Sequence, residues 1–157
     1  MSKKLRSFIF AIAIPLLVGG LSALLTSGGI GFYETIEKPT LSPPGIVFPI
    51  VWTILYILMG ISSGIIYNSD SPDTIKNSAI AIYVSQLIIN FFWSIIFFNL
   101  RAFLPAFVLV LILLALIGAM IIAFLKIDKK AAFLQIPYFL WVSFATYLTL
   151  SIYLLNK

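Results

Sequence analysis

The chain has 157 residues, of which 62% are hydrophobic and only 10% are charged, and its mean hydropathy is +1.14. This balance excludes a water-soluble globular protein and indicates that lipid is the solvent for most of the chain. Cysteine and histidine are both absent, so we expect no metal site, no haem ligation and no required cofactor. The net charge of +5 does not indicate nucleic-acid binding, because the basic residues lie at the ends of apolar segments.

The N-terminus combines basic residues with a long apolar run. Lys3, Lys4 and Arg6 precede apolar residues that continue from Phe8 to about Leu25. A run of this length exceeds the core of a signal peptide and suits a membrane span. We therefore expect this segment to be retained as the first span.

Five apolar segments are long enough to cross a bilayer, which requires roughly 20 residues in a helix. They are predicted at residues 6–26, 46–67, 78–98, 103–125 and 131–155. Glycines after the first segment, and a polar run at 68–77 after the second, are expected to be loops. The predicted fold class is all-α: an integral membrane bundle of five transmembrane helices that forms a single domain over residues 1–157.

Charge placement predicts the orientation of the bundle. Every acidic residue lies in a predicted loop, so the spans lack the intramembrane charges that mark proton-coupled pumps. A cytoplasmic N-terminus places seven basic residues inside and three outside. The seven are Lys3, Lys4, Arg6, Lys76, Lys126, Lys129 and Lys130, and the three are Lys38, Arg101 and Lys157. We expect a multi-pass protein, in the cell membrane, with its N-terminus cytoplasmic and its C-terminus and first loop outside.

The first loop is stiff and lies next to aromatic residues. Three prolines, Pro39, Pro43 and Pro44, fix the backbone near its end, and Tyr33 and Trp52 flank it. These features favour a lid over the mouth of the bundle. The alternative is an ordinary external connection.

Amides and aromatic rings share one face of the third segment. Gln86, Asn90 and Ser94 recur every four residues, and Trp93 and Phe97 adjoin them. The amides either bond neighbouring helices, which is the commoner use, or bind a ligand.

The fifth and second segments carry further patterns. Pro137, Trp141 and Ala145 share a face of the fifth segment, where Pro137 either starts or kinks the helix and Trp141 is either a membrane-interface anchor or a pocket wall. Gly60 and Gly64 form a small-xxx-small step, for which packing within the bundle is favoured over dimerisation.

Several short motifs, in order, resemble the tryptophan-rich sensory protein family, also called the translocator protein or peripheral benzodiazepine receptor family. The resemblance covers nearly the whole chain. The motifs are Lys38-Pro39, Pro43-Pro44, Val51-Trp52, Leu55-Tyr56, Met59-Gly60, Gln86-Leu87, Asn90, Trp93, Phe97-Phe98, Arg101, Pro137-Tyr138, Trp141 and Phe144.

This resemblance implies a five-helix bundle, usually a homodimer, with a pocket beneath the first loop that binds porphyrins and synthetic hydrophobic ligands. It implies that Tyr33, Pro43, Trp52, Asn90, Trp141 and Ala145 belong to or adjoin that pocket, and the aromatic face adds Trp93. Tryptophans of animal members are replaced here by Phe32 and Leu41, and the sterol motif of those members is absent in its usual register.

The sequence is compatible with three functions. The leading hypothesis is a membrane receptor or sensor that binds protoporphyrin IX, with the metal-free form favoured because no axial ligand is available. The second is light-dependent oxidative degradation of protoporphyrin, with Trp52 and Trp141 as candidate catalytic residues. The third is transport of porphyrin or another amphipathic solute. The expected partners are a small hydrophobic ligand, membrane lipid and a second copy of the chain.

Overall fold

The computed structural model describes residues 1–157 and contains helices and no strands. The helices are α1 (Lys3–Leu25), α2 (Gly29–Thr35), α3 (Val47–Tyr67), α4 (Asp73–Phe98), α5 (Phe103–Leu125), α6 (Lys129–Phe133) and α7 (Ile136–Leu155). Five spans are long and apolar enough to cross a membrane, and α6 and α7 together form the last one. The predicted all-α class and the five spans are confirmed.

Three spans begin earlier than the apolar pattern predicts, and the difference is largest for α1 and α4. Helix α1 starts at Lys3 because the Ser2 hydroxyl accepts a hydrogen bond from the Leu5 amide at 3.1 Å. Helix α4 starts at Asp73 instead of residue 78, and the Asp73 carboxylate suits the positive end of a helix. Hydropathy located the apolar part of each helix, and the polar first turns precede that part.

The prediction that glycine breaks the chain after α1 is only partly right. Gly28 lies outside a helix, but Gly29 and Gly31 belong to the short helix α2. A side chain at Gly29 would place its Cβ 2.6 Å from the Phe98 ring. This glycine therefore permits close packing of α2 on α4, a role that its turn preference did not reveal.

The last span is interrupted near its start. Helix α6 ends at Phe133, Gln135 precedes α7, and Pro137 lies in the first turn of α7. Pro137 thus starts a helix and does not kink one, because a first-turn residue needs no intrahelical N–H donor.

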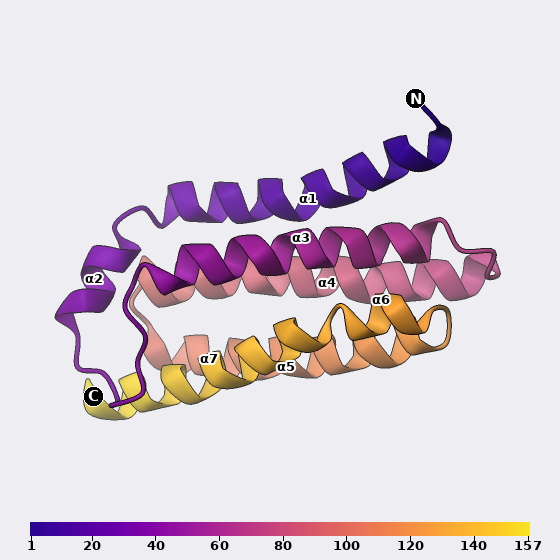
Figure 1. Ribbon diagram of the computed structural model, residues 1–157. Helices are drawn as coiled ribbons and strands as arrows, with labels where there is room; N and C mark the ends of the chain where they lie inside the picture. The colour runs from indigo at the N-terminus through magenta and orange to yellow at the C-terminus, as the bar shows by residue number, and fades with distance from the viewer.

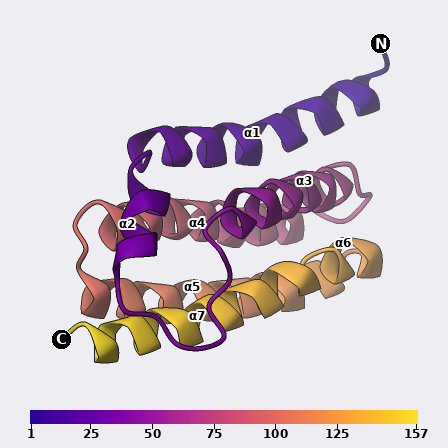
Figure 2. The ribbon, with the colours of Figure 1, turned by 60° about the vertical axis from the view of Figure 1, so that its left-hand side comes forward.

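The spans pack side by side with α1 on α3, α4 on α5 and α5 on α7 (Figure 1). Helix α3 contacts α6, where the Ser62 hydroxyl donates to the Ala131 carbonyl oxygen at 2.7 Å. Only the first turns of α1, at the N-terminal end of the chain, lie away from α3 and α4, as both Figure 1 and Figure 2 show.

Gly60 and Gly64 face α1 inside the bundle. A Cβ at Gly60 would lie 2.4 Å from the Ile12 Cα, and a Cβ at Gly64 would lie 2.6 Å from the Phe8 ring. The small-xxx-small step therefore serves packing within the chain, as favoured from the sequence.

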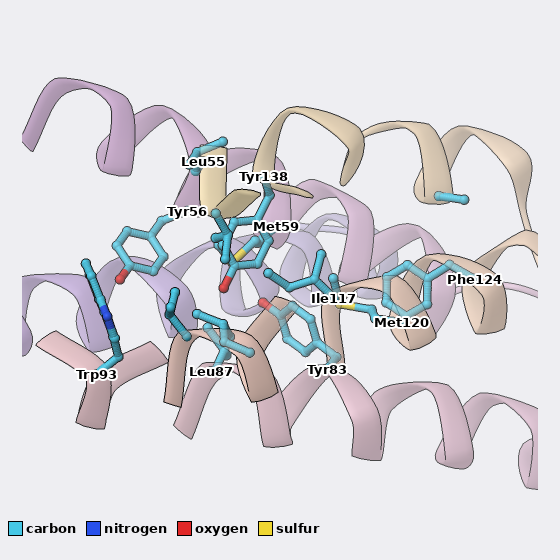
Figure 3. Packing of buried hydrophobic residues seen from close by; sticks show 14 of the residues in the cluster. Leu55, Tyr56, Met59, Tyr83, Leu87, Trp93, Ile117, Met120, Phe124 and Tyr138 are labelled. Carbon is cyan, nitrogen blue, oxygen red and sulfur yellow. The ribbon is translucent and has the colours of Figure 1, made fainter. Parts of the chain in front are cut away.

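Aromatic and aliphatic side chains fill the interior between the spans. Figure 3 shows Tyr56, Met59 and Tyr138 meeting in the middle of the bundle, with Trp93 toward one end and Phe124 toward the other. Large apolar side chains also cover the outside, and Leu17 and Leu24 are 71% and 75% exposed. An apolar exterior over an apolar interior is the arrangement expected in lipid.

Candidate ligand-binding site

The first loop, residues 26–46 including α2, crosses one end of the bundle (Figure 2). It is held together internally by hydrogen bonds between its two halves. The Tyr33 hydroxyl donates to the Pro43 carbonyl oxygen at 3.0 Å, and the Gly45 amide donates to the Glu34 carboxylate at 2.9 Å. The loop is therefore an ordered cover and not a loose connection.

The end of the last helix fastens this cover. Asn156, which follows α7, accepts a hydrogen bond from the Glu37 amide at 3.1 Å and donates to the Glu37 carbonyl oxygen at 2.9 Å. At another point of the loop, the Arg101 guanidinium lies 4.3 Å from the centroid of the Phe32 ring. Arg101 has a φ of 52°, so the tight turn between α4 and α5 places this residue in the left-handed region.

Tyr33 connects the cover to the interior. Its side chain is only 1% exposed, and its ring meets the Phe48 ring edge-on at a centroid distance of 4.9 Å. Burial raises the pKa of the Tyr33 hydroxyl, the neighbouring Ser42 side chain opposes that effect, and the Glu34 charge adds to it. The hydroxyl is thus neutral near pH 7 and remains a hydrogen-bond donor.

A small aromatic cavity lies directly beneath the first loop. Its volume is about 10 Å³, so it is closed in this structure. It is lined by Tyr33, Phe48, Trp52, Trp93, Phe97, Phe98, Trp141, Ala145, Leu148 and Thr149. A second cavity of about 160 Å³, on the α1 side, shares Phe48, Trp52, Trp93 and Phe98 with it. These four aromatic side chains form the partition between the two spaces.

Trp52 lies at the centre of the aromatic contacts. Its ring centroid is 5.6 Å from that of Tyr56, 6.3 Å from Trp93 and 6.1 Å from Tyr138. One indole of α3 thereby meets rings from α4 and α7. Such contacts leave large, rigid apolar faces on which a flat ligand can stack.

A groove opens on the side of the bundle between α3 and α7. It has a volume of about 650 Å³ and is lined by Pro43, Val51, Ile54, Leu55, Pro137, Leu140, Trp141 and Phe144. Trp141 lines both this groove and the inner cavity. Its indole is therefore the wall between the lipid-facing groove and the interior.

Six of the seven predicted ligand-binding residues line the inner cavity of about 10 Å³ or the groove between α3 and α7. The inner cavity brings together Tyr33, Trp52, Trp93, Trp141 and Ala145. Pro43 lines the groove, which Trp141 joins to the cavity. The structure thus gathers residues from the first loop and from α3, α4 and α7, although they are far apart in the sequence.

Asn90 lines neither space. Its side-chain amide donates to the Tyr138 hydroxyl at 3.1 Å, and that hydroxyl donates to the Gln86 side-chain carbonyl oxygen at 2.6 Å. Asn90 and Gln86 are both buried, so these bonds join α4 to α7 within the apolar interior. The geometry is that of interhelical bonding, and a contact between Asn90 and a ligand remains a prediction.

Three buried polar atoms near the site have no hydrogen-bond partner. They are the indole N–H groups of Trp93 and Trp141 and the side-chain carbonyl oxygen of Asn90. Buried polar groups are usually paired, and unpaired ones cost free energy. Both indoles line the cavity, so a ligand with acceptor atoms would meet unused donors there.

The sequence interpretation missed several lining residues, among them Phe48, Leu148 and Thr149. The sequence pattern could have predicted Thr149, because the helix face through Trp141 and Ala145 continues to Thr149 four residues later. Phe48 gave no comparable signal, since one phenylalanine in a hydrophobic span is indistinguishable from a lipid-facing residue.

The sequence matches the TspO/MBR family over residues 11–155. A tryptophan-rich protein TspO of Chlorobaculum tepidum is 33% identical over 157 residues, which cover 99% of each chain. Another protein of this name, from Archaeoglobus fulgidus, is 35% identical over 94% of this chain and 95% of its own. The human translocator protein is 31% identical over 88% of this chain and 82% of its own.

Proposed function

Because this chain belongs to the TspO/MBR family of multi-pass membrane proteins, we propose that it is a receptor or sensor that binds a porphyrin such as protoporphyrin IX beneath the first loop. The observation that carries this proposal is the convergence of Tyr33, Trp52, Trp93 and Trp141 on one cavity. Aromatic faces suit a flat macrocycle, and the unpaired indole N–H groups suit its carboxylates.

Binding requires the site to expand. Sites for small organic ligands occupy about 300–1,000 Å³, far more than the closed inner cavity of about 10 Å³. Movement of the Phe48 and Trp52 side chains would join this cavity to its neighbour of about 160 Å³. Movement of Trp141 would join it to the groove of about 650 Å³, which gives a hydrophobic ligand a path from the membrane.

Incubation of the purified protein with protoporphyrin IX in the dark and in light tests the proposal. A saturable shift of the porphyrin absorbance in the dark, unchanged by illumination, is the result expected of a receptor. The same titration with zinc protoporphyrin provides the comparison, because a protein side chain that ligates the zinc raises its affinity. If zinc protoporphyrin bound as tightly as the metal-free form or more tightly, with the spectrum of an axially ligated metal, the prediction that the site has no axial ligand would be contradicted. Absence of saturable binding would refute the proposal.

A second candidate function is light-dependent oxidative degradation of protoporphyrin, with dioxygen as the oxidant. The contacts of Trp52 with Tyr56, Trp93 and Tyr138 favour it, because they place several oxidisable rings around the proposed ligand. A new absorbing product that forms only in light and in the presence of dioxygen would support this activity. Accumulation of porphyrin inside proteoliposomes would instead support transport.

A further inference from the structure

A separate large cavity, distinct from the three spaces described above, lies at the end of the bundle opposite the first loop. Its volume is about 540 Å³, and its walls come from the first half of α1, the end of α3 and the first half of α4. At this end the first turns of α1 lie away from α3 and α4 (Figure 1). This cavity shares no lining residue with the candidate porphyrin site.

The lining of this cavity is amphipathic. Lys3 and Arg6 lie at its outer end, one helical turn apart, and no acidic residue lines it. Deeper in, the walls are apolar and include Phe10, Ile14 and Val84. A ligand that fits must combine a negatively charged head with an apolar tail.

The length of the cavity matches one leaflet of a bilayer. From Lys3 to Ile14, α1 rises about 16 Å at 1.5 Å per residue, which is about half the 30 Å hydrocarbon thickness. The charged end therefore lies at the level of the lipid headgroups when the helix spans the membrane. The apolar walls then reach about as far inward as an acyl chain.

An unused donor lines the same cavity. The Tyr83 side chain is 4% exposed, and its hydroxyl has no hydrogen-bond partner. The neighbouring Ser63 hydroxyl already donates to the Gly60 carbonyl oxygen at 3.1 Å. A phospholipid carries ester carbonyl oxygens below its phosphate, and such an acceptor would satisfy Tyr83.

We propose that this cavity binds one acidic phospholipid from the leaflet at the N-terminal end of α1. Lys3 and Arg6 pair with its phosphate, an ester oxygen accepts from Tyr83, and an acyl chain lies between α1 and α4. The combination of a cationic mouth, a buried donor and an apolar wall one leaflet long selects this occupant over a free anion or a neutral lipid.

Native mass spectrometry of the detergent-solubilised protein tests the site with phosphatidylglycerol and phosphatidylcholine of identical acyl chains. The wild-type protein should bind one phosphatidylglycerol in preference to phosphatidylcholine. The double variant Lys3→Gln/Arg6→Gln should lose about fivefold in phosphatidylglycerol affinity per residue, the factor equivalent to about 1 kcal/mol for each basic residue near an anionic lipid. Affinity for phosphatidylcholine should change little.

The double variant Lys4→Gln/Lys129→Gln is the matched control. It removes the same charge at the same end of the bundle from residues that do not line the cavity, so it should keep the preference. An equal loss in this control would reduce the effect to general surface charge and overturn the proposal. Binding of inorganic phosphate with the affinity of the lipid would show a free-anion site and also overturn it.

Val84→Trp tests the path of the acyl chain. Val84 is 45% exposed, so a larger side chain can enter the cavity without disturbing the buried core. The circular dichroism spectrum and the unfolding temperature should show that the Val84→Trp variant is folded. In this folded variant, occupancy of the cavity by phosphatidylglycerol should fall. Unchanged occupancy in this folded variant would place the lipid elsewhere and refute the site.

Discussion

At the scale of single residues, two indoles occupy the centre of the candidate site. Trp52 contacts three aromatic rings, and Trp141 separates the inner cavity from the groove. Replacement by phenylalanine keeps an aromatic face but removes the most oxidisable ring. An aromatic pair contributes about 0.5–1.5 kcal/mol beyond buried area, and phenylalanine retains part of this contribution.

We therefore expect Trp52→Phe and Trp141→Phe each to keep most of the protoporphyrin affinity, measured by absorbance titration in the dark. If indole takes part in photochemistry, the same variants should form no product in light. Conversion at the parental rate by both variants would remove the only candidate catalytic residues. Phe144→Leu, which alters the groove but leaves both indoles, is the control for general changes in packing.

Substitution of Asn90 distinguishes a role in hydrogen bonding between helices from a role in ligand binding. Its hydrogen bond to Tyr138 predicts that Asn90→Leu lowers the free energy of unfolding by about 0.6 kcal/mol, the average for such bonds in a membrane interior. If this bond is the whole role of Asn90, porphyrin affinity should change little. Tyr138→Phe removes the same bond from its other end. A double-mutant cycle should therefore show coupling between the two positions, and a large loss of affinity in stable Asn90→Leu protein would reassign Asn90 to the ligand.

The residue scale also shows where sequence interpretation ends. Helical periodicity put the amides of α4 on one face together with Trp93, and the structure agrees that Gln86, Asn90 and Trp93 are all buried. Periodicity could not state which neighbour satisfies each amide, because Tyr138 lies 48 residues from Asn90 and the two meet only through helix packing.

At the scale of helices and loops, small residues determine how closely α1 approaches α3. Gly60→Ala places a Cβ against backbone atoms of Ala11 and Ile12, which cannot rotate away, so we expect a loss of about 1–3 kcal/mol in the free energy of unfolding. Gly20→Ala is the control, because no atom lies within 4 Å of its added Cβ. It should stabilise α1 by about 0.5–1 kcal/mol. Equal effects of both substitutions in a detergent-unfolding assay would contradict the packing described.

The fastening of the first loop by Asn156 gives a second test at this scale. Asn156 and Asn68 each follow a helix and donate to the carbonyl oxygen four residues earlier at 2.8 Å, but only Asn156 also bonds the first loop. Asn156→Ala should therefore loosen the cover and speed porphyrin association, since the open state becomes more populated. Stopped-flow mixing should show no such increase for Asn68→Ala. A slower or unchanged rate in Asn156→Ala would exclude the loop as a barrier.

Hydropathy predicted the spans well, and the fourth, at residues 103–125, matches α5 in both bounds. It failed at α2 and at the break between α6 and α7, where short helices are fixed by contacts with other elements. Gly29 packs on Phe98, and Ala131 accepts from Ser62. Neither contact leaves a local signal in the sequence, because the partners lie on distant spans.

At the scale of the whole molecule, the predicted homodimer must use a surface other than the glycine step. Gly60 and Gly64 pack against α1 of the same chain, so they cannot also pack against a second copy. We propose that any dimer forms through an outer helix face. Cross-linking in liposomes should then be insensitive to substitutions at Gly60 that leave the protein folded.

The orientation in the membrane is the remaining property of the whole chain that the sequence predicts, and the absence of cysteine makes it directly measurable. Single cysteines at Ser2 and Asp70 lie at the end of the bundle with most basic residues, and one at Thr35 lies in the exposed part of α2 at the other end. The excess of lysine and arginine near the first end predicts that this end is cytoplasmic. In intact cells, an impermeant maleimide should therefore label the Thr35 position only, and permeabilisation should expose the other two. Labelling of Ser2 and Thr35 from the same side would show that α1 does not cross the membrane and would contradict the five-span bundle. Labelling of Ser2 and Asp70 alone in intact cells would show that the bundle is inserted the other way round.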